Sequence, residues 1–279
     1  MTNAPLPRSR ADIRRAPFPI FGKVFTDSWR SLIGWGVGLA AVIFLYLPIY
    51  PSIGGSSQMQ DLINSLPKQL TKSIGYDQIS TGSGYTESTM FGLLGFLLMT
   101  IAAVSWGASA LGGDEESGQL ELTLAHGVTR VQVALERFAA LAVKVLALTA
   151  LVFVLVLALN GPSKLELDPL KLLGTSLLFG GLTLLSGTVA LLFGALFGRR
   201  VWGIGAGAFV AVVGYIFNAI GNQSSDLAWL HSFSPYSWVF GNTPLTNGAN
   251  WGTAIGFYLA ILALGGLTAL VLRKRDVGV

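Results

Sequence analysis

The residues of this chain whose types could do chemistry gather in one short stretch, GGDEESGQLELTLAHGVTR at residues 112–130. Arg130 is its single Arg or Lys, against four carboxylates: Asp114, Glu115, Glu116 and Glu121. Carboxylates grouped in this way can complement the dipole of their own helix or contact a partner protein. The stretch lies between two long apolar segments, so the elements that position these carboxylates are expected to be membrane spans.

The rest of the sequence offers little that can catalyse a reaction. It contains no GxxxxGK[ST] phosphate-binding loop, and the one Gly-Lys pair, Gly22-Lys23, lacks the rest of that pattern. The two histidines, His126 and His231, are expected in loops on opposite sides of a membrane, so they cannot share a metal. The absence of Cys excludes thiolate catalysis and Cys-ligated metals. We therefore expect no enzymatic activity, no cofactor and no metal in this chain itself.

The composition is that of an integral membrane protein. Hydrophobic residues make up 52% of the chain and charged residues 11%, whereas a soluble domain usually carries about 25% charged residues. The net charge is +4. That balance does not indicate a nucleic-acid partner, because the Lys and Arg residues flank apolar segments and form no basic patch.

Six segments reach the length of about 20 residues that a membrane span requires. They cover residues 31–50, 89–111, 138–160, 170–197, 201–221 and 251–272. Of the 18 Lys and Arg residues, thirteen lie in segments on the side of the N-terminus and four on the opposite side. Because positive charge concentrates in the cytoplasm, both termini are predicted to be cytoplasmic. The loop 51–88 and the segment 222–250 are then external, and residues 273–279 form a cytoplasmic tail.

The N-terminal region is predicted to be a disordered tail, residues 1–17, followed by an amphipathic helix, residues 18–30. The helix is indicated by four aromatic residues at helical spacing: Phe18, Phe21, Phe25 and Trp29. Such a helix can lie in the plane of the cytoplasmic interface. The alternative is a simple extension of the first span.

Two features inside the spans suggest packing or function. Lys144 is the one ionisable side chain well inside a predicted span, and its long stem can carry the ammonium group to the interface. Small residues four apart, Gly34 with Gly38 and Gly203 with Gly207, allow close helix approach. They serve either packing within the bundle or an interface with a second chain.

The acidic stretch itself can be built from local rules as one helix over residues 114–125. Asp114 suits the N-cap, and Glu115 and Glu116 then lie on the first turn, where the helix dipole favours negative charge. Gly127 suits the position after the helix end. Thr129 and Gln132 form a capping box that begins the next helix.

The region from Thr86 to Leu141 resembles permeases of the ABC type-2 transporter family, the antibiotic- and multidrug-type exporters. That family follows its second span with Glu-Glu-x-Gly-Thr-Leu-Glu and then Pro-Val-Ser-Arg. The matching residues here are Glu115, Glu116, Gly118, Leu120, Glu121, Val128 and Arg130, with Gln119 in place of Thr and Gly127 in place of Pro. HSFSPYSWVFGNTPLTNG at residues 231–248 is similar to the segment before the last span of the family, and LRKRDV to its tail.

The resemblance implies an all-α fold of six spans, with a cytoplasmic coupling helix at residues 114–125 and short, partly re-entrant external helices before the last span. The coupling helix would dock on a separate ATP-hydrolysing subunit, which binds the ATP and Mg²⁺. The residues implied in that contact are Asp114, Glu115, Glu116, Gly118, Glu121 and Arg130. Two permease chains, like or unlike, and two ATPase subunits would complete an exporter in a cell membrane, expected to be bacterial.

The compound moved is expected to be hydrophobic or amphiphilic (an antibiotic, a drug or a lipid-like molecule), since the spans lack charge. Two other functions remain open on the sequence. The chain can be a non-transporting membrane anchor that recruits a cytosolic partner, or a secondary transporter, although the spans show no proton relay.

Overall fold

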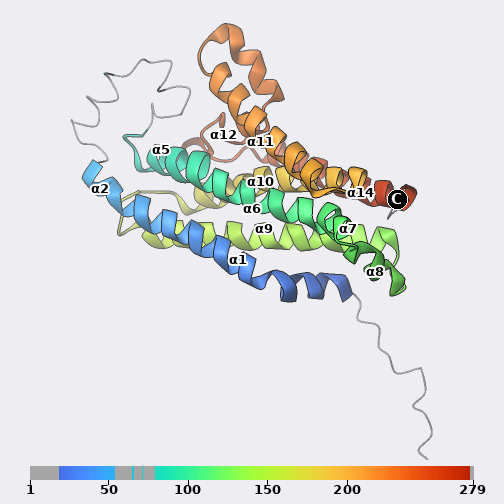
Figure 1. Ribbon diagram of the computed structural model, residues 1–279. Coiled ribbons are helices and arrows are strands. Elements are labelled where there is room, and N and C mark those ends of the chain that lie inside the picture. The colour runs from blue at the N-terminus through green and yellow to red at the C-terminus, as the bar shows by residue number, and fades with distance from the viewer. Residues whose placement is uncertain (1–18, 54–64, 66–70, 72–78, 277–279) are drawn as a thin grey trace, which may run out of the picture.

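The computed structural model describes residues 19–53, 65, 71 and 79–276 of the chain, which form an elongated bundle of helices (Figure 1). Six helical stretches are long and apolar enough to cross a membrane, and no strand occurs in the described residues. The predicted all-α fold with six spans is therefore confirmed. The predicted tail 1–17, Phe18, most of the loop 51–88 and residues 277–279 lie outside the described residues.

Long helices account for four of the spans and most of a fifth, and they are joined by short ones. The long helices are α1 (Pro19–Tyr46), α9 (Arg130–Asn160), α10 (Pro169–Phe197), α11 (Arg200–Gly221) and α14 (Trp251–Lys274). The first is extended by η2 (Leu47–Ile49) and α2 (Tyr50–Ile53). Between α11 and α14 lie η6 (Ser225–Phe233), α12 (Pro235–Phe240) and α13 (Pro244–Asn247). Short helices before the last span were expected; that they re-enter the membrane stays a prediction.

The second span is one helical rod in which two π-helical stretches interrupt the α-helix. It consists of α5 (Gly82–Thr86), the π-helical η4 (Glu87–Leu94), α6 (Gly95–Ala108), the π-helical η5 (Ser109–Gly113) and α7 (Asp114–Glu116). The rod begins seven residues before the predicted start at residue 89, because Thr81 caps it: its Oγ1 accepts a hydrogen bond of 3.0 Å from Gly84 N. π-helical turns are rare in proteins as a whole, but those that do occur are often found at functional sites.

The first span differs from the prediction of a separate interfacial helix. Residues 19–46 form one continuous helix, so the predicted amphipathic segment and the first span are parts of the same helix. That its first turns lie in the interface stays a prediction. The helix changes direction near its start, as its first turns run at an angle to the rest in Figure 1. Phe21 and Phe25 stack on each other with ring centroids 5.1 Å apart, whereas Trp29 is half exposed.

The centre of the bundle is α10, which contacts α6, α9, α11 and α14. Glycines allow this close packing. A Cβ on Gly107 of α6 would lie 2.1 Å from Gly187 O of α10, so the two backbones touch there. Three buried hydroxyls of α10, on Thr183, Ser186 and Thr188, bond to carbonyls of their own helix and so satisfy polar groups away from water.

The four predicted packing glycines divide into two kinds. A Cβ on Gly203 or Gly207 would lie 2.6–2.7 Å from a carbonyl oxygen of α10, so both glycines pack α11 inside the bundle. Gly34 and Gly38 meet nothing within 4 Å. The pair on α11 is therefore used within this chain, and only the pair on α1 leaves its face open to lipid or to another chain.

The bundle has two ends that carry different elements (Figure 1). We call the end with the first turns of α1, α7, α8 (Gln119–Ala125) and the C-terminus of α14 the α8 end. The opposite end carries α2, α5, α12 and α13, and we call it the α12 end. The distribution of Lys and Arg predicts that the α8 end is cytoplasmic.

Candidate functional site

The acidic stretch lies at the α8 end, but it forms two helices instead of the single predicted helix 114–125. Asp114, Glu115 and Glu116 form α7, the last turn of the second span, and α8 begins only at Gln119. Gly118 separates them with a φ of +72°, a left-handed conformation that stops a helix and suits glycine. The prediction that Asp114 caps the coupling helix is therefore wrong.

The helix dipole was expected to stabilise Asp114, Glu115 and Glu116 at the start of a helix, but they lie at the end of one. Carboxylates at the last turn of a helix face the negative end of its dipole, which disfavours them. Their positions must therefore be stabilised by cations from elsewhere in the fold. Two arginines supply that charge, and each comes from a different span.

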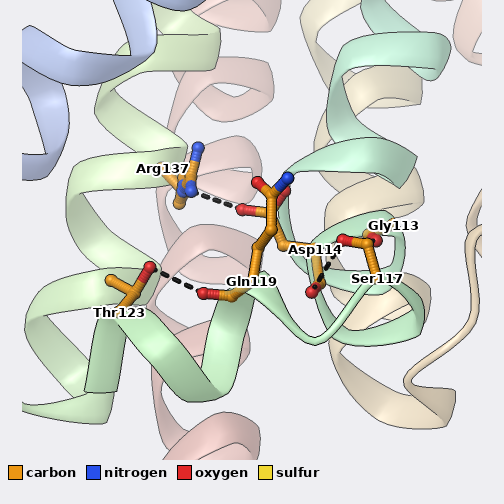
Figure 2. A network of polar contacts seen from close by, with 6 residues as sticks. All are labelled: Gly113, Asp114, Ser117, Gln119, Thr123 and Arg137. Carbon is orange, nitrogen blue, oxygen red and sulfur yellow. Dashed lines mark hydrogen bonds and ion pairs between the residues drawn. The ribbon is translucent and has the colours of Figure 1, made fainter. Parts of the chain in front are cut away.

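Asp114 pairs with Arg137 of α9 (Figure 2). Both side chains are largely buried, with 18% and 17% of their surfaces exposed. In the same view Ser117 closes the end of the helix, since its hydroxyl donates to Gly113 O at 2.9 Å and to Asp114 O at 3.2 Å. Asp114 thus joins the end of the second span to the third span.

Glu115 pairs with Arg275, at the C-terminal end of α14. Only 9% of the Glu115 side chain is exposed. The Arg275 guanidinium also donates to Ala195 O on α10. Gly198 lies directly beside the pair, because a Cβ there would be 2.6 Å from Glu115 Oε1. We call Glu115 and Arg275 the clamp; it joins the ends of the second, fourth and sixth spans.

Arg130 belongs to the same cluster. Its Nη1 donates to Arg275 O at 2.5 Å and lies 3.9 Å from Asp276 Oδ1. The start of α9 is therefore tied to the C-terminal end of α14. The sequence resemblance gave Arg130 a role in contacting a partner, and the structure places its side chain on its own chain. No short-range pattern marks Arg137 or Arg275, because their partners are 23 and 160 residues away.

A further carboxylate, Glu136 of α9, holds the start of α1. Its Oε2 accepts hydrogen bonds from Ile20 N at 2.9 Å and Phe21 N at 2.8 Å, and its Oε1 accepts one from Gln132 Nε2 at 2.7 Å. Glu136 is 4% exposed. The first amides of a helix have no partner within it, so a buried carboxylate 115 residues away acts as the N-cap of α1.

Of the four carboxylates of the acidic stretch, Glu116 and Glu121 are exposed at the α8 end and form no ion pair within the part of the chain that the structure describes. Leu120, with no exposed surface, anchors α8 to the bundle, whereas Leu122 on the same helix is 65% exposed. The helix closes with Thr123 Oγ1 donating to Gln119 O at 2.8 Å (Figure 2). The end of α7 and the helix α8 thus expose one carboxylate each, Glu116 and Glu121, and α8 adds the large apolar side chain of Leu122.

A groove of about 580 Å³ adjoins this surface. It lies between α8 and the first turns of α1. Its walls carry both charges and apolar groups: Ile20, Lys23, Asp27, Gln119, Leu122, Thr123, His126, Val128 and Arg137. The predicted amphipathic start of α1 and the acidic stretch are therefore brought together, although they are separated by about 90 residues of sequence. Within the residues that the structure describes, no group of three or more metal-binding side chains occurs.

Lys144 lies inside the bundle, which differs from the expectation that its long stem carries the ammonium group to the interface. It is 5% exposed, and its Nζ lies 5.1 Å from the ring centroid of Trp106 on α6. Trp106 Nε1 in turn donates to Ser31 Oγ on α1 at 3.0 Å. A cation–π contact therefore replaces solvent as the environment of this ammonium group.

Six apolar helical stretches, each long enough to cross a membrane, define a multi-pass membrane protein. The family model for the ABC-2 family transporter protein matches residues 18–277, and the chain belongs to this family. The chain is thus a permease component of an ABC transporter, in a class of multi-pass membrane proteins that work with an ABC ATPase. Comparisons with curated proteins and with solved structures found no match.

Proposed function

We propose that this chain is the permease of an ATP-driven exporter and that α8 is the coupling helix on which a separate ATPase subunit docks. The observation that carries the proposal is the free surface of α8 and the adjoining end of α7. Glu121 and Leu122 of α8 and Glu116 of α7 are exposed there, although Asp114 and Glu115 are held by arginines. The free carboxylates would pair with basic residues of the ATPase. Leu122 would bury its apolar surface there.

The ATP and Mg²⁺ would be bound by the partner, and this chain would hydrolyse nothing. Six spans are half of a translocator, so two permease chains, like or unlike, and two ATPase subunits are proposed. The open face at Gly34 and Gly38 of α1 is available for the contact between permeases. Both termini would lie in the cytoplasm, and the compound would leave towards the α12 end.

The apolar groove between α6 and α11 supports the proposal that the transported compound is hydrophobic or amphiphilic. Its volume is about 500 Å³, and its walls are almost wholly apolar: Leu93, Phe96, Leu97, Thr100, Ile101, Val104, Ser105, Ile204, Ala208, Ala211, Val212 and Tyr215. It contains no charged residue. A charged group entering it would lose hydration without a counter-ion, so the compound would place an uncharged, apolar part there.

The direct test is purification of the permease together with its ATPase. The double substitution Glu116→Arg/Glu121→Arg should abolish co-purification and the transport that depends on ATP, because it reverses the charge of the docking surface. The matched control is Asp276→Arg, a reversal at an exposed carboxylate of the same end but outside α8. Equal complex formation and equal ATP hydrolysis in wild type and double variant would refute the coupling assignment.

The same preparation separates this proposal from the other functions left open by the sequence. A complex that forms and hydrolyses ATP but moves no compound into vesicles would indicate an anchor or assembly protein. Movement of a compound that follows a proton gradient and ignores ATP would indicate a secondary transporter.

A further inference from the structure

Tyr236 of α12 lies at one end of the apolar groove between α6 and α11. Its ring makes edge contacts with two residues of the groove wall, Phe96 of α6 and Tyr215 of α11, each with a centroid distance of 5.2 Å. A third ring, Phe240 of α12, lies 4.8 Å away. Tyr236 is 8% exposed. The aromatic side chain thus fills the space between the two helices where the groove reaches the α12 end.

The Tyr236 hydroxyl is also fixed. It donates to Gly92 O, in the π-helical η4, at 2.8 Å. A Cβ on Gly92 would lie 2.8 Å from this hydroxyl, so glycine leaves the room that it needs. Burial raises the pKa of the Tyr236 phenol, which keeps the hydroxyl protonated and able to donate.

A second attachment joins α13 to η4 about one turn before Gly92. Glu87, the first residue of η4 and 7% exposed, accepts a hydrogen bond of 2.8 Å from Leu245 N of α13. Leu245 is 158 residues away in the chain. At the surface Thr246 Oγ1 lies 3.0 Å from Ser83 Oγ of α5, and Lys171 Nζ donates to Thr246 O at 2.6 Å. The segment α12–α13 is therefore fastened to the second span at several points.

Most of the attachments lead to the second span. Two attachments have other partners, namely the bond from Lys171 and the bond of 2.6 Å that Ser234 Oγ, at the cap of α12, donates to Gly214 O of α11. The other partners belong to α5 and η4, the first part of the same rod whose last turn, α7, leads into the coupling helix. A displacement of that rod along its axis or about it would therefore change the geometry of the bonds to Gly92 and Glu87. The partner segment η4 is π-helical, a winding that is rare and that occurs frequently at functional sites.

We propose that Glu87 and Tyr236 form a latch that closes the α12 end of the groove, and that transport requires its release. Tyr236 is the plug, and Glu87 is a positioning residue that holds α13 and thereby α12 in place. The inference rests on the proposed function, in which the groove is part of the path of the compound.

The first experiment measures access to the groove and needs no ATP. The chain contains no Cys, so Thr100→Cys, at a groove position with a buried hydroxyl that has no hydrogen-bond partner, creates a single thiol. A charged, membrane-impermeant thiol reagent is added from the α12 side of vesicles that contain the complex. Adding Tyr236→Ala or Glu87→Ala to this variant should raise the labelling rate about tenfold, as expected for losing a hydrogen bond together with ring contacts.

Two matched variants make the labelling result specific. Tyr236→Phe keeps the ring and loses only the bond to Gly92 O. Its labelling rate should therefore lie between that of Thr100→Cys alone and that of Thr100→Cys with Tyr236→Ala. Trp238→Ala removes another aromatic ring of the same short helix, which makes an edge contact with Phe257 of α14 at a centroid distance of 6.2 Å, and it should leave the rate unchanged. Unchanged labelling in Tyr236→Ala, or an equal increase in Trp238→Ala, would overturn the latch without touching the ATPase assignment.

The second experiment locks the latch. In Ser83→Cys/Thr246→Cys the two sulfurs replace oxygens 3.0 Å apart, so oxidation should form a disulfide that holds α13 on α5. The oxidised complex should keep its bound ATPase and lose transport, and reduction should restore transport. Transport at full rate with the disulfide closed would contradict the proposal. Loss of ATPase binding in both redox states would instead count against the proposed docking at α8.

Discussion

The carboxylate of Glu115 pairs with the guanidinium of Arg275, a residue 160 positions later in the chain. The pair lies beside Gly198, at the turn between α10 and α11. It therefore connects the helix that leads into α8 with the ends of the fourth and sixth spans. A push on α8 would reach these spans through a charged contact as well as through the backbone.

Neutralising either member of the clamp should lower stability more than it lowers docking. Glu115→Gln or Arg275→Gln leaves a largely buried charge without its partner, at a cost of about 2 kcal/mol, as for other hydrogen bonds to charged groups. The midpoint of thermal unfolding in detergent should fall, whereas the ATPase should still co-purify. The double variant should be less destabilised than the sum of the single ones. Strict additivity would contradict the direct pairing.

Gly118→Ala should disturb the junction between α7 and α8. An alanine at a φ of +72° is strained by about 1 kcal/mol, and relief of the strain would let α7 continue and would displace α8. We expect weaker co-purification of the ATPase with little change in span packing. Gly22→Ala is the control, since Gly22 lies in a helix and meets nothing within 4 Å. If Gly118→Ala bound the ATPase as wild type does, the left-handed junction would be dispensable.

Glu136→Ala should free the N-terminal turn of α1. It removes the acceptor of Ile20 N and Phe21 N and should cost about 2 kcal/mol, the upper range for a helix cap. Hydrogen exchange of these amides should accelerate in the variant. Glu136→Gln keeps an acceptor oxygen and should exchange more slowly than Glu136→Ala. Equal protection in wild type and Glu136→Ala would show that other groups hold this turn.

Valine substitutions should separate the two glycine pairs. A Cβ on Gly207 would lie 2.7 Å from Ser186 O, so Gly207→Val should destabilise the bundle by about 3 kcal/mol through overpacking. A Cβ on Gly38 would meet nothing within 4 Å, so Gly38→Val should leave the folded chain intact. If α1 forms the contact between two permeases, Gly38→Val should weaken that association in cross-linking or in light scattering. Equal destabilisation by both substitutions would contradict the placement of α1 at the surface.

Several properties of this protein follow from local patterns and were predictable from them. The six spans follow from apolar runs of sufficient length, because bilayer thickness sets the requirement residue by residue. The cap at Thr129, whose Oγ1 accepts from Gln132 N at 3.1 Å, was also predicted correctly, since capping depends on neighbours three positions apart. The end of α8 before Gly127, which has a φ of +80°, follows from the same kind of rule.

The errors arose where distant segments compete with local preference. Asp114 is a good N-cap by its type, but the second span continues through it because Arg137 of α9 compensates for its charge at the wrong end of the helix dipole. The predicted amphipathic segment and the first span join into one helix, since no Pro or Gly pair interrupts the sequence near residue 30. Gly203 and Gly207 could not be assigned to an internal or an external contact, because small-residue spacing is the same in both.

By itself, the sequence determined that this is a six-span membrane protein with a compact acidic segment between its second and third spans. Only the tertiary structure decided which acids remain free. Asp114 and Glu115 are held by arginines from the third and sixth spans, whereas Glu116 and Glu121 are exposed. The physical reason is that hydropathy and capping act over a few residues, whereas the pairing of a charge depends on which distant helix end packs beside it.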